Sequence, residues 1–131
     1  MQSIELTFHA TADLSARQFY AVKGSGEYGV AAITNGNAEV PIGILQNDPD
    51  ADGQPAVVCV FGRARARVGG AVSAFNKLSV NNTGELIAAP YEAAIGTADL
   101  YVVATALEDG ADNEIIDVFV NGFAAVPGSA E

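Results

Sequence analysis

The chain has 131 residues, of which half are hydrophobic, and its formal net charge is −10. This length favours one domain with a core that needs no metal or disulfide, and the apolar content excludes a disordered chain. The acidic charge argues against nucleic acid and anionic membranes as partners, because both are bound through basic residues.

The first half of the chain is predicted to form short strands. Residues 2–8 alternate, with Ile4, Leu6 and Phe8 on one side, which is typical of a half-buried strand or an extended arm. Further strands are predicted at 17–23, 30–34 and 39–46. The glycine-rich segment 24–29 and the pair Asn35-Gly36 are predicted turns, and Asn-Gly is a strong hairpin signal.

The central stretch, residues 41–68, combines an acidic loop at 47–53 with the apolar run 57–61. After this run Arg63, Arg65 and Arg67 alternate with small residues, which is the period of a strand. Half of the six basic residues therefore share one predicted strand face. This face is either solvated or a contact surface whose guanidinium groups bind carboxylates of a neighbour.

The second half continues the pattern of short strands, predicted at 77–80, 85–88 and 115–120. Residues 100–107 fit a helix or a strand, and Val102, Val103 and Thr105 favour the strand. The segment 71–76 fits one helical turn or a loop, and we favour the loop. No helix of typical length is predicted, so the fold class is all-β: a compact small β-barrel or sandwich, β-tulip-like, of short antiparallel strands with an extended N-terminal arm. The predicted organisation is an arm at 1–10, a single domain at 11–122 and a tail at 123–131.

Two motifs look like ligand sites but lack essential parts. GxGxxG at 24–29 is followed by too short a segment for the helix of a dinucleotide site. D-x-D-x-D-G at 48–53 opens like a calcium loop, but Cys59 stands where the bidentate glutamate belongs. His9 is the only histidine, so no histidine cluster can bind a metal. We therefore predict neither catalytic residues nor a cofactor or metal site.

The single cysteine and the chain start give two further expectations. Cys59 cannot form an intrachain disulfide, and its place in an apolar run predicts a small buried side chain. The first residues lack the basic flank and apolar core of a signal peptide, and no apolar run is long enough to span a membrane.

Four stretches are similar to the small phage proteins known as head decoration, or capsid cement, proteins. They are QFYAVK at 18–23, PIGILQNDP at 41–49, GRARARVGG at 62–70 and TALEDGADNEIIDVFV at 105–120. Their order and spacing match the family over residues 11–121. The acidic loop, with Asp48, Asp50 and Asp52, departs from many relatives, and we expect it to face solvent.

The resemblance implies a non-enzymatic virion protein, made in the host cytoplasm and located on the capsid exterior. It implies a homotrimer that binds the major capsid protein and stabilises the expanded capsid, without nucleic acid or membrane as a partner. An N-terminal arm would add a strand to a capsid-protein sheet. The residues implied are Ile4, Leu6 and Phe8 in the docking arm, and Arg63, Arg65 and Arg67 at a subunit or capsid face.

The alternative is a small non-enzymatic β-barrel that binds a glycan or another host-surface ligand. It requires an exposed aromatic platform, for which Tyr20, Tyr28, Tyr91 and Tyr101 are the available tyrosines.

Overall fold

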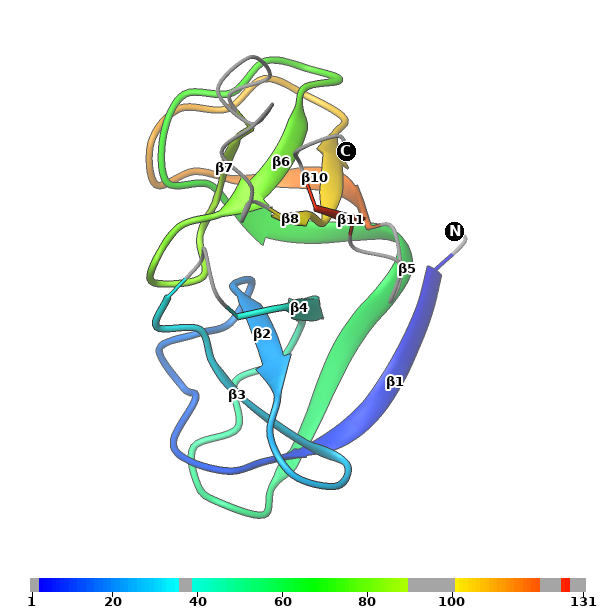
Figure 1. The fold of residues 1–131 in the computed structure, drawn as a ribbon, viewed down its shortest axis with the longest axis vertical. Coiled ribbons are helices and arrows are strands. Elements are labelled where there is room, and N and C mark those ends of the chain that lie inside the picture. The colour runs from blue at the N-terminus through cyan, green and yellow to red at the C-terminus, as the bar shows by residue number, and fades with distance from the viewer. Residues whose placement is uncertain (1–2, 36–38, 90–100, 121–125, 128–131) are drawn as a thin grey trace.

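The computed structural model describes residues 3–35, 39–89, 101–120 and 126–127, and in these ranges it contains strands and no helix (Figure 1). The predicted all-β class is therefore confirmed. Within the same ranges, no helix is long and apolar enough to cross a membrane.

Five strands close a small barrel. They are β1 (Ser3–Ala10), β2 (Ala21–Gly24), β3 (Gly29–Ala32), β4 (Pro41–Leu45) and β5 (Pro55–Arg67). They follow the order β1-β3-β2-β4-β5, and β5 closes the barrel by pairing with β1. The barrel core consists of aliphatic residues: Ala10, Leu14, Val22, Val30, Leu45, Ala56, Val58 and Val60.

A second layer continues the sheet from the far half of β5. It contains β10 (Ile115–Val120), β9 (Ala104–Ala106), β6 (Lys77–Val80) and β7 (Leu86–Ala88) in that order. β8 (Tyr101–Val102) and β11 (Val126–Pro127) form a separate two-stranded pair. The side chains of this second core include Ala64, Ala66, Val68, Leu78, Leu86, Ile116 and Val118.

β5 joins the two layers because it bends at a glycine. Gly62 has a φ of 101°, a backbone conformation that side chains with a Cβ rarely adopt. Its register partners are Ser3 on β1 and Val120 on β10, so it lies where the barrel ends and the second layer begins. Figure 1 shows the long strand turning at this level. β5, which lies within the predicted central stretch, thus belongs to both the barrel and the second layer.

Several predicted strand limits need correction. The strand predicted at 17–23 begins only at Ala21, because Arg17 and Tyr20 are in turns closed by Arg17 N–H to Leu14 O and Tyr20 N–H to Arg17 O. The segment predicted at 100–107 is split into β8 and β9. The turn at 24–29 is confirmed, and the predicted hairpin at Asn35-Gly36 lies partly outside the described residues.

Candidate functional site

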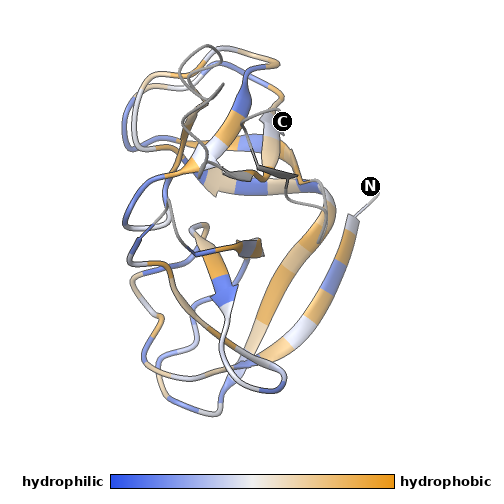
Figure 2. Ribbon diagram, viewed as in Figure 1, coloured by the Kyte–Doolittle hydropathy of each residue, from blue (hydrophilic) through white to orange (hydrophobic). Residues whose placement is uncertain are grey.

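The residues predicted as a docking arm form β1, which runs along the margin of the barrel. β1 pairs with β5 from Ser3 opposite Gly62 to His9 opposite Pro55. Ile4 and Leu6 remain 54% and 40% exposed, whereas Phe8 packs against the barrel core. The structure therefore separates two surface residues from a third that anchors the strand. Figure 2 shows hydrophobic residues recurring along both β1 and β5.

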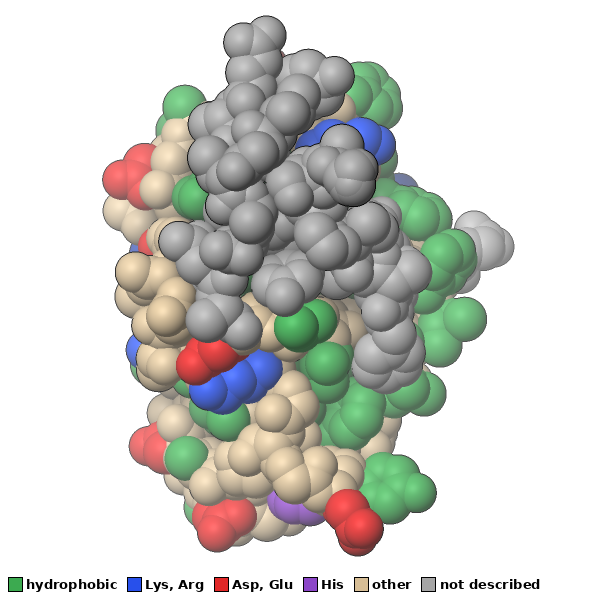
Figure 3. Space-filling model, viewed as in Figure 1, with side chains coloured by type: hydrophobic (Ala, Val, Ile, Leu, Met, Phe, Trp, Pro, Cys, Tyr) green, Lys and Arg blue, Asp and Glu red, His purple; other side chains and the backbone are tan. Residues whose placement is uncertain are grey.

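Two aromatic side chains extend the exposed apolar surface beyond β1. Phe61 lies opposite Ile4 in the register and is 46% exposed. Phe119 on β10 is 39% exposed, and its ring meets that of Phe61 edge to face, with centroids 5.3 Å apart. We call Ile4, Leu6, Phe61 and Phe119 the apolar patch. Figure 3 shows hydrophobic side chains gathered along the side of the molecule formed by β1 and β5.

Arg63 and Arg65 lie beside this patch on the outer face of β5. Both bind one carboxylate: Arg63 Nη2 is 2.7 Å from Asp117 Oδ2, and Arg65 Nη1 is 3.2 Å from Asp117 Oδ1. The hydrogen bond from Arg63 is the main reason why the pKa of Asp117 is lowered. Two guanidinium groups held by one aspartate are fixed in position yet remain largely exposed.

Arg67 does not share this arrangement, although it lies on the same strand. Its Nε is 3.0 Å from Glu85 Oε2 and its Nη2 donates to Asn113 Oδ1 at 3.1 Å. Its guanidinium also lies 5.9 Å from the centre of the Tyr20 ring. Arg67 therefore ties three segments of the same chain together, and the outer face keeps only Arg63 and Arg65 of the predicted row.

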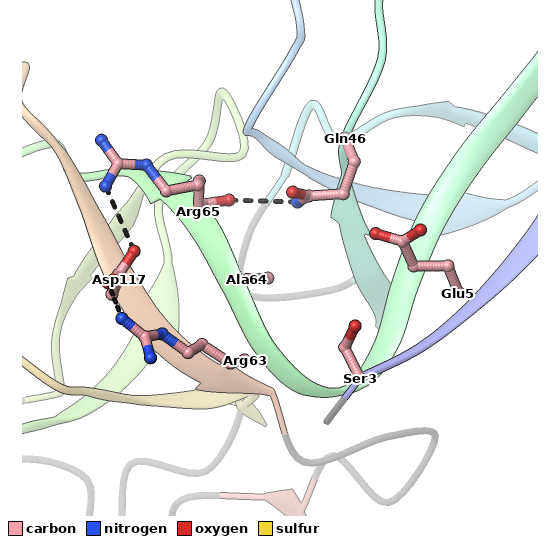
Figure 4. A pocket seen from close by; sticks show the side chains of 7 residues that line it. All are labelled: Ser3, Glu5, Gln46, Arg63, Ala64, Arg65 and Asp117. Atoms are coloured by element: carbon pink, nitrogen blue, oxygen red, sulfur yellow. Dashed lines mark hydrogen bonds and ion pairs between the residues drawn. The ribbon is translucent and has the colours of Figure 1, made fainter. Parts of the chain in front are cut away.

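A groove of about 480 Å³ lies on the concave side of the bend in β5. Its lining residues are Ser3, Glu5, Gln46, Arg63, Ala64, Arg65 and Asp117. Figure 4 shows the two arginines and Asp117 on one wall, with Ser3 and Glu5 of β1 on the other. Gln46 donates its side-chain N–H to the Arg65 carbonyl at 3.1 Å, which ties Gln46 to β5 in the lining of the groove. The walls carry two positive and two negative groups, so the groove is polar without a strong net charge.

Two solved structures share this fold. The N base of head fiber gp8.5 in bacteriophage phi29 aligns with a TM-score of 0.63 and 12% identity over 95% of this chain and 98% of that chain. A chain from the capsid of Myoviridae phage XM1 aligns with a TM-score of 0.69 and 18% identity over 94% of this chain and 86% of that chain. The chain has the fold of phage head proteins.

This likeness confirms, at the level of fold, the resemblance found in the sequence motifs. No family model matches the chain, and neither does any curated protein. The sequence identities to the phage head proteins are low, so the residues of the site rest on the geometry of this chain alone.

The ligand-like motifs occupy ordinary structural positions in the phage head fold. The acidic loop is a surface turn held by Asn47, whose side chain donates to Pro55 O and accepts from Val57 N–H. In the described part of the chain, no three His, Cys, Asp or Glu residues are grouped to hold a metal. Cys59 is buried as predicted, and burial raises the pKa of its thiol.

The tyrosines predicted as a possible platform do not gather on the described surface. Tyr20 is partly buried, with the guanidinium of Arg17 5.1 Å from its ring centre. Tyr28 is 79% exposed and lies at the end of the β2–β3 turn, directly before β3. Tyr91 lies outside the described residues, and Tyr101 begins β8.

Sequence reasoning missed Phe61 and Phe119. One signal for Phe119 was available, since residues 115, 117 and 119 alternate with 116, 118 and 120, and Asp117 marks the outward set. Phe61 had no such signal, because it follows the buried residues Val58, Cys59 and Val60 without alternation.

Proposed function

We propose that this chain is a virion structural protein that binds the outside of an assembled phage capsid and stabilises it, without enzymatic activity. The observation that carries the proposal is the apolar patch on a phage head-protein fold. Four large apolar side chains stay exposed side by side, and contiguous apolar surface on a soluble domain marks an interaction site.

The proposed contact with the major capsid protein combines β1 with the outer face of β5. Ile4 and Leu6 contribute apolar area, and Phe8 holds β1 on the barrel core. Arg63 and Arg65 add directional hydrogen-bond donors at the rim. Aromatic and arginine side chains together are the typical composition of binding hot spots.

We further propose a homotrimer on the capsid exterior, formed after synthesis in the host cytoplasm. Symmetry would repeat each weak contact three times, so a modest patch on each copy can give firm attachment. The formal charge of −10 opposes self-association over most of the surface. The arginine pair beside the patch is the part of the described surface best suited to lie between copies or against the capsid.

Binding of the purified protein to phage heads that lack it tests the proposal. We expect co-sedimentation with the heads and a higher temperature of DNA release. Replacing Ile4 and Leu6 together by serine is expected to abolish binding while the protein remains folded, because both side chains are exposed. Tyr28→Ser, at a more exposed site away from the patch, serves as the control. The proposal fails if the wild-type protein does not bind the heads.

A further inference from the structure

The outer edge of β1 has few pairing partners among the described residues. One edge of the strand pairs with β5 along nearly its whole length, from Ser3 to His9. The other edge pairs with β3 only at His9 and Ala10, which are opposite Gly29 and Val30. Within the described residues, no strand covers this edge over residues 3–8. Figure 1 shows β1 at the margin of the molecule.

The direction of the backbone groups on this edge follows from two hydrogen bonds. His9 N–H donates to Tyr28 O on the β3 side, whereas Ala10 N–H donates to Gln54 O on the β5 side, each at 2.8 Å. Backbone groups of successive residues in a strand point to opposite edges. Glu5 and Thr7 therefore direct their N–H and C=O groups the same way as His9, toward the open edge.

This edge carries little of the usual protection against pairing, since Glu5 is the only charged residue between Ser3 and Phe8. Natural edge strands are blunted by lysine, proline or a bulge of the edge strand itself. The segment Ser3 to Phe8 contains no lysine or proline, and the irregularity between Ile4 and Glu5 places its extra residue in β5. The exposed side chains of Ile4 and Leu6 lie along the same segment. The edge is thus ready to pair, with apolar surface beside it.

We propose that β1 stays in the barrel and accepts an extended strand of the capsid protein on its open edge. This inference rests on the proposed function and reverses the direction implied by the family resemblance, in which an arm leaves this protein. Removing β1 from β5 would open the barrel and uncover Ala56 and Val58, both fully buried, so release is costly.

The chemistry of β1 defines the incoming strand. The incoming strand lies beside residues 3–8 and ends at His9, where β3 pairs with the same edge. Its apolar residues, at alternate positions, cover Ile4 and Leu6, and a basic residue lies across from Glu5. A second copy of this chain fits less well, because each copy carries a charge of −10 and would have to supply a basic residue from an acidic surface.

A disulfide between β1 and β5 tests whether β1 stays in the barrel or leaves it when the protein binds the head. Glu5 is opposite Cys59, and because Glu5 points its N–H outward this is a non-hydrogen-bonded pair, in which Cα atoms are roughly 4.5 Å apart. That separation suits a disulfide, so Glu5→Cys with the native cysteine should lock β1 in the barrel. The reduced form of the same variant is the matched control.

We expect oxidised and reduced Glu5→Cys to bind purified heads with affinities within about twofold of each other. A loss of tenfold or more in the oxidised form alone would show that β1 must leave, and would overturn the inference. In that case the wild-type protein still binds heads, so the proposed function stands. If the wild-type protein does not bind heads at all, both proposals fail.

Blocking the edge tests the same inference from the other side. Thr7→Pro removes an outward N–H and leaves the bonds between Leu6, Phe8 and β5 in place, so it should weaken head binding at least tenfold relative to Thr7→Ala. Equal binding by these two variants would overturn the inference. A dimer of the wild-type protein that Thr7→Pro dissociates would assign the edge to a second copy and overturn it as well.

Discussion

Replacing Phe61 and Phe119 by alanine, singly and together, distinguishes a docking role from a folding role. Each ring is somewhat more than half buried, and full burial of a phenylalanine contributes about 1.5–3 kcal/mol, so each single variant should lose about 1–1.5 kcal/mol of unfolding free energy. The edge-to-face contact adds about 0.5–1.5 kcal/mol, so the double variant should lose less than the sum of the two singles by that amount.

The Phe61 and Phe119 substitutions should weaken binding to phage heads far more than they lower the unfolding free energy. A side chain at the centre of an interface costs at least about 2 kcal/mol on truncation, which is roughly a thirtyfold loss of affinity. Urea unfolding gives the stability differences, and co-sedimentation with purified heads gives the affinities. Tyr28→Ala, which removes a more exposed ring outside the patch, is the control. Head binding within twofold of wild type for Phe61→Ala, or an equal loss for Tyr28→Ala, would refute the assignment of the patch.

Three further predictions concern stability, each measured by chemical denaturation. Arg67→Ala should lower the unfolding free energy by about 1.5–3 kcal/mol, because the hydrogen bonds of Arg67 join separate segments. Arg65→Ala should lower it by less than about 1 kcal/mol, because its ion pair is exposed. Equal losses for the two variants would contradict the different roles assigned to Arg65 and Arg67. Hydrogen bonds from Lys23, which has the largest effect, and from Thr34 and Asn35 lower the pKa of Glu39 from 4.5 to about 2. The stability that Glu39 provides above pH 4.5 should therefore be lost as the pH falls from 4.5 to about 2. Glu39→Gln should flatten that part of the profile, and an unchanged profile would exclude this pair as its cause. Gly62→Ala should cost about 1–3 kcal/mol because its φ of 101° is strained for alanine, and a neutral effect would show that the bend does not need glycine.

The candidate site was only partly predictable from the sequence. Alternation placed Ile4 and Leu6 on one strand face, and their exposure agrees with a surface contact. The same alternation grouped Phe8 with Ile4 and Leu6, although the Phe8 side chain packs against the barrel core. Arg63 and Arg67 also share a sequence pattern, yet one contacts Asp117 across the sheet and the other Glu85. A period of two fixes the face of a strand but not the neighbours that this face meets.

The amino-acid sequence by itself determined the all-β class, because short β-branched runs divided by glycine-rich turns leave no room for helices. It also determined the buried state of Cys59 and the outward row of Arg63 and Arg65. Only the tertiary structure decided that β1 closes a barrel, that no described strand covers its outer edge over residues 3–8, and that Phe61 contacts Phe119. Closure of the barrel and the contact between Phe61 and Phe119 depend on pairing between residues 46 to 59 positions apart in the chain, and no local pattern encodes such a register.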